Sequence, residues 1–311
     1  MTDTQQPRLD HNSAAFIAAE TAETALQKTY HLTAHSHFFE DQSGLRIRLT
    51  EIGEGKPVFL VPGNTGDLYP YIPMIATLPG YHFYILNRPG GGLSDGFDHT
   101  KVAMQSFVSN LIDRVWNHLG LTQAPIVAHS MGCHWAAWFI FDHPEKVTSF
   151  VMIGNPGRIM MPDTPKALSL MLHKPFTGLL KRKLVPKDRS HAKDEQVTMG
   201  TREEVRDHLP ETYYDAVYAF EKLPNYAEST ITLLQSFQQH ASLIINQHQL
   251  KQLKLPTALI WGEKDPLGPL DHGREIAESI DGCQFDIIKD SGHMPWMEEP
   301  EQVSSAIKEF I

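Results

Sequence analysis

The stretch PIVAHSMGCHWAAWF, residues 125–139, decides how the chain is expected to fold. An apolar, strand-like run ends at Ala128, and a helical stretch rich in Ala and Trp begins at Met131. Ser130 lies at this junction, with the small residues Ala128 and Gly132 two positions to either side. A strand that turns sharply into a helix needs small residues there, because larger side chains would collide across the turn. The pattern predicts a nucleophilic Ser130 at a helix N-terminus, where partial positive charge favours a developing anion.

Working outward from this junction, short apolar runs alternate with longer amphipathic stretches. The strand-like runs are 35–40, 45–52, 58–61, 83–86, 126–128 and 150–153, and the amphipathic stretches are 69–78, 102–119 and 131–141. The pattern resumes with 257–261, 276–280, 285–288 and a closing helix near 301–310. Strands that alternate with helices predict an α/β fold, in which a mostly parallel sheet is covered by helices on both faces.

The alternation stops between residue 155 and about residue 254, where helical pieces are separated by prolines. The expected organisation is a core of residues 35–155 and 251–311 with an all-helical cap inserted at 156–250. Residues 1–34 are expected to be an N-terminal helical extension, with an Ala-rich helix near 13–30. Because open α/β sheets bind ligands at their carboxyl edge, we expect the cap to cover that edge.

Two further motifs supply partners for Ser130. WGEKDPLGP, residues 261–269, follows a strand and places Asp265 in a loop, and DSGHMPWMEEP, residues 290–300, places His293 in the loop after the last strand. The chain order Ser, Asp, His is the order used with a nucleophile elbow. Histidine would take the serine proton, and a buried carboxylate would hold the imidazole in the required tautomer. Asp290 and Asp271 are nearby alternatives to Asp265.

Backbone amides are the expected stabilisers of an oxyanion. VPGNTGD, residues 61–67, follows a strand, and its glycine-rich turn can direct an N–H group toward the reacting carbonyl oxygen. A second N–H is expected from Met131, the residue after the nucleophile. Asn155, at the end of another strand, is a candidate for substrate binding, with a structural turn as its alternative.

Taken together, these motifs resemble the α/β-hydrolase superfamily over roughly residues 35–155 and 255–311. NRPGGGLSD (87–95) is similar to the family's loop after the fourth strand, and HPEKV (143–147) to the end of the helix behind the nucleophile. Two positions depart from the family: Pro62 precedes Gly63 in place of His, and Asn87 replaces the usual aspartate. The resemblance carries the first amide donor over to Asn64. It implies a serine hydrolase that cleaves a carboxylic ester or related acyl compound through an acyl-enzyme, with no metal and no cofactor.

Several alternatives remain open at this point. Relatives of the fold use the same triad to cleave a carbon–carbon bond next to a ketone, or to transfer an acyl group to peroxide, and a ligand receptor with little turnover is a third class. Dehalogenases and epoxide hydrolases use an aspartate nucleophile, which Ser130 argues against. Ser130 could instead cap a helix, Asp265 brace a turn and His293 pack, while Cys133 is expected to be a small buried hydrophobe.

The composition limits the class of protein. The chain has 311 residues, of which 41% are apolar and 21% charged, and a net charge of −10 that argues against nucleic-acid binding. Two cysteines make neither a disulfide framework nor a metal site. The polar start lacks a secretory signal, and the apolar run 135–141 is too short to span a bilayer. We expect a soluble, cytoplasmic protein that acts on a small molecule, whose oligomeric state the sequence leaves open.

One stretch, residues 166–193, reverses the overall charge. It has a single acidic residue, Asp188, and the basic residues Lys166, Lys174, Lys181, Arg182, Lys183, Lys187, Arg189 and Lys193. A solvated helix face explains such a stretch. The alternative is a docking surface for an anionic substrate tail or peripheral contact with a membrane, because apolar residues accompany the charges.

Overall fold

An eight-stranded sheet runs through the centre of the molecule, in the order β1-β2-β4-β3-β5-β6-β7-β8. The structure is a computed structural model that describes residues 8–41, 43–160, 166–173, 175–239 and 241–311. The strands are β1 (Ala34–Glu40), β2 (Arg46–Gly53), β3 (Lys56–Val61), β4 (Tyr81–Leu86), β5 (Ala124–His129), β6 (Val147–Ile153), β7 (Thr257–Gly262) and β8 (Gln284–Ile288). Only β2 runs antiparallel to its neighbours, so the sheet is mostly parallel, as the alternating pattern predicts.

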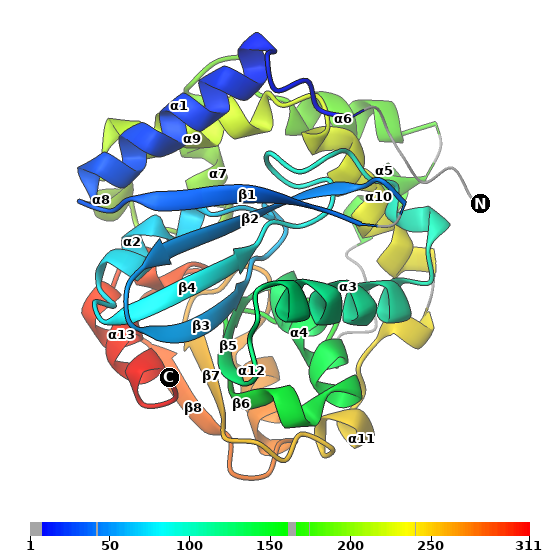
Figure 1. Ribbon diagram of the computed structural model, residues 1–311, viewed down its shortest axis with the longest axis vertical. Coiled ribbons are helices and arrows are strands. Elements are labelled where there is room, and N and C mark those ends of the chain that lie inside the picture. The colour runs from blue at the N-terminus through cyan, green and yellow to red at the C-terminus, as the bar shows by residue number, and fades with distance from the viewer. Residues whose placement is uncertain (1–7, 42, 161–165, 174, 240) are drawn as a thin grey trace.

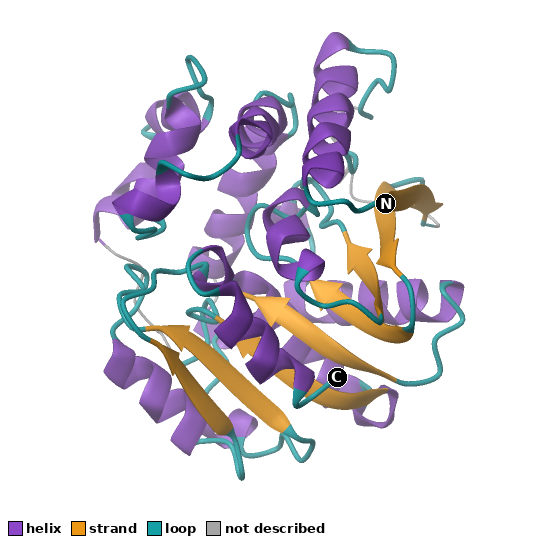
Figure 2. Cartoon of the chain, turned by 90° about the vertical axis from the view of Figure 1, so that its left-hand side faces the viewer, coloured by secondary structure: helices purple, strands orange, loops and turns teal. Residues whose placement is uncertain are grey.

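Helices cover both faces of this sheet (Figures 1 and 2). The helices are α1 (Ala14–Thr29), α2 (Ile72–Ala76), α3 (Met104–His118), α4 (Met131–Asp142), α5 (Lys166–Leu172), α6 (Thr177–Leu184), α7 (His191–Thr198), α8 (Glu203–Arg206), α9 (Glu211–Glu221), α10 (Tyr226–Gln239), α11 (Gln247–Leu250), α12 (Leu270–Glu278) and α13 (Pro300–Lys308). The α/β fold class expected from the sequence is therefore confirmed.

The two faces of the sheet bury separate apolar cores because successive side chains of a strand point to opposite sides. In β3, Val58 and Leu60 pack with residues of α1, α2 and α13, whereas Phe59 and Val61 pack with residues of α3, α4 and α12. Trp116 and Trp138, both fully buried, belong to the second core. This burial on both faces explains why the parallel strands are continuous apolar runs and do not alternate with polar residues.

Between β6 and β7, the described residues form helices α5 to α11 and no strand of the sheet. Figure 2 shows helices stacked above the layer of strands. This helical segment is tied to the core by side chains of α10 and the residue preceding it. The side-chain amide of Asn225 donates to the carbonyls of Gly92 (3.0 Å) and Ser94 (2.9 Å). The Ser229 Oγ accepts from the backbone N–H of Phe97 (3.2 Å).

Helix α1 also belongs to the packed molecule. The Ser13 side chain accepts from the Phe16 amide and caps α1, which confirms the helix expected near residues 13–30. α1 then packs along α9 of the inserted segment (Figure 1). Phe16, Ala19 and Leu26 are its buried apolar residues, so this helix is part of the core on that face.

The loops at the carboxyl ends of the parallel strands meet at one edge of the sheet. They follow β3, β4, β5, β6, β7 and β8 and carry Asn64, Asn87, Ser130, Asn155, Asp265 and His293, respectively. The sheet thus brings every residue of the expected catalytic set to the same edge.

Candidate active site

Ser130 lies on a strained turn between β5 and α4. Its backbone has φ 52° and ψ −126°, a conformation that L-residues other than glycine rarely adopt. The Ser130 amide donates to the carbonyl of Ile153 at 3.0 Å, which fixes the turn to the end of β6. The serine side chain makes no capping hydrogen bond to the helix. The geometry is therefore that of a nucleophile elbow, and helix capping does not explain the serine.

The turn is possible because its neighbours are small. A Cβ atom at Gly132 would lie 2.2 Å from the Val61 carbonyl oxygen and 2.5 Å from that of Pro62. A Cβ at Gly63 would lie 3.1 Å from Cβ of Ser130. The Gly132 requirement inferred from the sequence thus has a specific cause, which is the close approach of the loop after β3 to the start of α4.

His293 and Asp265 are hydrogen-bonded to each other in the interior. Nδ1 of His293 lies 2.7 Å from Oδ2 of Asp265, and their side chains are 2% and 0% exposed. Gly154 follows Ile153, whose carbonyl accepts from the Ser130 amide. The backbone of Gly154 lies against the imidazole of His293, because a Cβ at Gly154 would be 3.1 Å from Nδ1 and Cε1 of His293. The imidazole is therefore next to the strand end that fixes the elbow, with Nδ1 turned to the carboxylate.

The carboxylate of Asp265 is held by backbone amides as well. Asn155 N–H donates to Oδ2 at 2.9 Å, and Leu267 N–H donates to Oδ1 at 2.8 Å. The Asn155 side chain donates to the Leu267 carbonyl at 2.8 Å, a contact that braces the turn after β7. Asp265 therefore both braces its own turn and orients His293.

The alternative acids lie elsewhere. Asp290 forms an exposed ion pair with Lys264 at 2.8 Å, and Asp271 is exposed in the first turn of α12. Among these three aspartates, Asp265 is the one whose carboxylate contacts His293.

A buried hydrogen-bonded chain joins the loop after β3 to the carbonyl of His293, and we call Gly63, Tyr71 and His129 the neutral chain. Gly63 N–H donates to the Tyr71 hydroxyl at 2.7 Å, and that hydroxyl lies 3.0 Å from Nδ1 of His129. Nε2 of His129 lies 3.1 Å from the carbonyl oxygen of His293. Because a carbonyl only accepts, Nε2 of His129 carries the proton, and Nδ1 accepts from Tyr71.

Burial keeps this chain uncharged. Burial, followed by the neighbouring imidazole of His293, holds the pKa of His129 well below its ordinary value. Burial likewise raises the pKa of Tyr71 well above that of a free phenol. The amide of Gly63 is occupied by Tyr71, which leaves the next amide, that of Asn64, as the candidate donor of this loop. Met131, the first residue of α4, has one of the amides that a helix cannot bond internally.

The histidine loop is supported by residues that the sequence motifs did not indicate. The amide of His293 donates to the carbonyl of Met199 at 2.8 Å. Met199 belongs to the inserted helical segment. The Glu298 carboxylate accepts from the amides of Gly292 (2.6 Å) and Arg202 (2.8 Å). The segment near Met199 therefore packs directly against the catalytic loop. Tyr71 comes from an amphipathic stretch without a recognisable motif. Glu298 and His129 lie within the motifs 290–300 and 125–139, but the motifs give these two residues no role.

The structure confirms the expected burial of Cys133. Cys133 is fully buried as a small hydrophobe, and burial raises the pKa of its thiol. Within the described ranges, no three His, Cys, Asp or Glu side chains are grouped so as to hold a metal ion. No helix in the described part of the chain has the length and apolar character to cross a membrane.

Comparisons with known proteins agree with this architecture. The model of a family described as alpha/beta hydrolase fold matches residues 56–300. The chain is 24% identical over 286 residues to a 2-hydroxy-6-oxononadienedioate/2-hydroxy-6-oxononatrienedioate hydrolase of Paraburkholderia phymatum, covering 88% of this chain and 93% of that protein. A protein of the same description from Burkholderia vietnamiensis is 26% identical over 292 residues, with the same coverage.

Solved structures show the same fold at low sequence identity. The carboxylesterase CesB of Bacillus subtilis superposes with a TM-score of 0.74 at 16% identity, covering 96% of this chain and 98% of that one. A meta-cleavage product hydrolase, CumD, superposes with a TM-score of 0.71 at 19% identity, covering 88% of this chain and 97% of that one. At these identities the likeness concerns the fold.

Proposed function

The chain belongs to the alpha/beta hydrolase family, and we propose that it hydrolyses a carboxylic ester or related acyl compound with Ser130, Asp265 and His293. The observation that carries this proposal is the strained elbow of Ser130 next to the buried His293–Asp265 pair. The hydroxyl of an unassisted serine is too weak a nucleophile, and an imidazole held by a carboxylate supplies the missing base.

In the proposed reaction, Nε2 of His293 takes the proton of Ser130 while Oγ attacks the acyl carbon. Asp265 holds the other nitrogen as N–H and stabilises the imidazolium. The amides of Asn64 and Met131 donate to the carbonyl oxygen as it becomes negative. His293 then returns the proton to the departing alcohol, which leaves the acyl group on Ser130. Water, deprotonated by His293, attacks the acyl-enzyme, and the acid departs as the serine is restored.

We further propose that residues 156–250 act as a cap that selects the substrate. The contact of Met199 with His293, together with the contacts of Asn225 near the loop after β4, supports this role. For Asn155 the contacts favour support of Asp265 over direct binding of substrate.

Cleavage of a carbon–carbon bond next to a ketone is the second candidate. It is favoured by the sequence relatives, which are 2-hydroxy-6-oxononadienedioate/2-hydroxy-6-oxononatrienedioate hydrolases. Turnover of short p-nitrophenyl esters compared with a 2-hydroxy-6-oxo-dienoate would separate the two reactions. A fluorophosphonate label on Ser130 without turnover of either compound would identify a receptor instead.

Ser130→Ala tests the proposal directly. Activity is expected to fall by about 10⁶-fold, the loss typical of a triad nucleophile, while the thermal unfolding midpoint stays near that of the wild type. Turnover, unfolding and fluorophosphonate labelling are measured on the same preparation. A Ser130→Ala protein that retained wild-type turnover would refute the assignment.

A further inference from the structure

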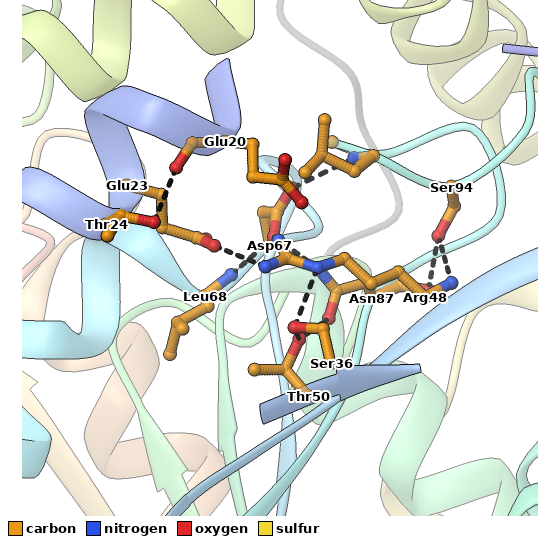
Figure 3. Close-up of polar contacts among 12 residues, drawn as sticks. Glu20, Glu23, Thr24, Ser36, Arg48, Thr50, Asp67, Leu68, Asn87 and Ser94 are labelled. Carbon is orange, nitrogen blue, oxygen red and sulfur yellow. Dashed lines mark hydrogen bonds and ion pairs between the residues drawn. The ribbon is translucent and has the colours of Figure 1, made fainter. Parts of the chain in front are cut away.

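A second buried polar cluster lies behind the loop that carries Asn64, and Figure 3 shows it between α1, β2 and two loops. Arg48 of β2 is in the middle: it forms an ion pair with Glu23 of α1 through Nη2 and lies 3.4 Å from Oδ1 of Asp67 through Nη1. The side chains of Arg48, Glu23 and Asp67 are 5%, 1% and 0% exposed. We call these three residues the charged chain.

The burial of three charges needs an explanation, since removing each ion from water is costly and one guanidinium faces two carboxylates. Glu23 is the one charged residue among the buried side chains of α1. Burial, followed by the charge of Glu23, raises the pKa of Asp67 to about 7, against the opposing effect of Arg48. A helix that needed only to dock could do so with its apolar residues Phe16, Ala19 and Leu26.

Asp67 connects this cluster to the loop after β3. Its Oδ1 accepts from the Leu68 amide at 2.8 Å and from the Asn87 side chain, and its Oδ2 accepts from the Leu93 amide at 3.3 Å. Its Oδ2 also occupies the space beside Gly92, where a Cβ would lie 1.2 Å away. Asn87, where the family resemblance expects an aspartate, thus donates to a carboxylate on the facing loop.

Arg88 holds the same loop from the other side. Its amide donates to the Gly66 carbonyl at 2.9 Å, and its Nη2 donates to the Asn64 carbonyl at 2.6 Å. Arg88 is 3% exposed, and the nearby carboxylate of Asp67 stabilises the positive charge of its guanidinium. The charges of Glu23, Arg48, Asp67 and Arg88 therefore alternate in sign from α1 to the peptide that carries Asn64.

We propose that Glu23, Arg48 and Asp67 are positioning residues, through which the N-terminal helix sets the orientation of the Asn64 amide in the oxyanion site. This inference rests on the proposed function, because it assumes that Asn64 donates to the oxyanion. It gives residues 1–34 a role in catalysis that the family motifs do not contain, since α1 precedes the first strand of the core.

The test compares two conservative changes on one helix. Glu23→Gln keeps the shape of the side chain and removes the charge that is ion-paired with Arg48. Glu20→Gln makes the same chemical change one turn earlier, at an exposed position whose charge acts on Arg48 from farther away. Steady-state kinetics on a short p-nitrophenyl ester give kcat and KM. The rate constant and the final extent of labelling by a fluorophosphonate are measured on both variants, because its tetrahedral adduct occupies the oxyanion site.

For Glu23→Gln we expect kcat and the labelling rate constant to fall together by about 10-fold, with KM within about twofold and labelling still complete. Glu20→Gln should match the wild type in all four quantities. In Asp67→Asn, kcat and the labelling rate constant should fall at least as far as in Glu23→Gln. If Asp67→Asn does not fold, the result for Glu23→Gln alone decides the test.

A purely structural role predicts a different result. Glu23→Gln would then reduce the fraction of protein that can be labelled and leave the rate constant of the labelled fraction unchanged. That result, or equal kinetics for Glu23→Gln and Glu20→Gln, overturns the inference. The proposed function fails separately, if wild-type protein is not labelled at Ser130.

Discussion

The two buried polar chains hold opposite ends of one loop by different means. The neutral chain holds Gly63 through the Tyr71 hydroxyl and His129, whereas the charged chain holds Asp67 through Arg48 and Glu23. Both are excluded from solvent, and both support the peptide that presents the Asn64 amide. The neutral chain leads on to the histidine loop, and the charged chain leads outward to the N-terminal helix.

This difference shows which contacts a change of pH can alter. Burial keeps His129 and Tyr71 uncharged over the whole physiological range, because the pKa of the imidazole is lowered and that of the phenol raised. Asp67, with a pKa of about 7, changes charge within that range. The elbow side of the loop is therefore expected to be insensitive to pH, and the Asp67 side sensitive to it.

After Ser130→Ala, the next largest effect is expected at the proposed catalytic acid, which belongs to neither chain. Asp265→Asn should keep the fold and lower kcat by about 10⁴-fold, because the amide favours the wrong tautomer of His293. Asp290→Asn and Asp271→Asn are matched controls, since both carboxylates are exposed and neither contacts the imidazole in the structure. Kinetics on one ester suffice for all three. A nearly neutral Asp265→Asn together with a severe loss in either control would show that the acid is misassigned.

Tyr71→Phe breaks the neutral chain. Gly63 N–H and Nδ1 of His129 would both be left buried without a partner, and each such group costs about 1–3 kcal/mol of the free energy of unfolding. We expect kcat to fall by about 10-fold as the loop relaxes, with the pH profile of kcat unchanged in shape. Urea unfolding and kinetics from pH 5.5 to 8.5 provide the measurement.

Tyr81→Phe is the control for that change, because its hydroxyl makes a long 3.4 Å contact with the carbonyl of Ile311, at the chain end. Its stability and kinetics should stay close to the wild type. A pH profile that shifted in Tyr71→Phe would mean that the neutral chain contains a titrating group after all, and the division between the two chains would fail.

The sequence predicted the parts of the site that local patterns encode. Ser130, Asp265 and His293 each follow a strand in a short motif, and the structure brings all three to one sheet edge. The sheet and its helices followed from alternating apolar runs, because parallel strands are buried on both faces. Their catalytic roles remain predictions until the variants above are measured.

The two chains could not be predicted, because their partners are distant in sequence and chemically ordinary. Glu23 is one of two glutamates in an Ala-rich helix, where a solvated position is the normal expectation. Tyr71 meets His129 across 58 positions of the chain. Only the assembled sheet determines which of these side chains are buried together.

A smaller effect concerns stability and the charged chain. The pKa of Asp67 is raised in the folded state, so the folded protein binds that proton more tightly than the unfolded chain does. The free energy of unfolding should therefore be highest below the unfolded pKa of about 4 and decrease as pH rises toward 7, by at most about 1.4 kcal/mol per pH unit for this group. Above pH 7 the contribution of Asp67 is lost.

Urea midpoints at pH 5.5, 6.5 and 7.5 test this slope. Burial raises the pKa values of Glu195 and Glu221 to about 7 and about 9. These two carboxyls therefore also lower the free energy of unfolding as pH rises, and they do so in every variant. The informative quantity is the difference between variants: Asp67→Asn should show a shallower slope than the wild type, and Tyr71→Phe a parallel one. Equal slopes for Asp67→Asn and the wild type would mean that Asp67 does not titrate in this range.

The smallest expected effect comes from outside both chains, on the surface of the inserted segment. Of the basic stretch 166–193, Lys174 lies outside the described residues, Lys181 pairs with Glu228 at 3.1 Å, and Arg189 pairs with Glu211 and Asp215. Arg182, Lys183 and Lys187 are exposed, as are the apolar side chains of Leu170, Phe176 and Leu179 in the same stretch of the chain. Partial neutralisation of the stretch limits how strongly it can attract an anion.

We therefore expect a few-fold preference for anionic acyl compounds, carried by long-range attraction and not by direct binding. Exposed charges are screened beyond about 10 Å at 0.1 M salt, so kcat/KM for an anionic ester should fall as ionic strength rises, while that for a neutral ester of similar size should not. Reversing the charges of Lys181, Arg182 and Lys183 together should reduce the preference and leave kcat on the neutral ester unchanged, because these side chains are exposed on the surface of the inserted segment, whereas both chains that hold the oxyanion loop are buried. If both esters respond equally to salt in the wild type, the stretch is a solvated helix face and the buried chains alone carry the electrostatics of this enzyme.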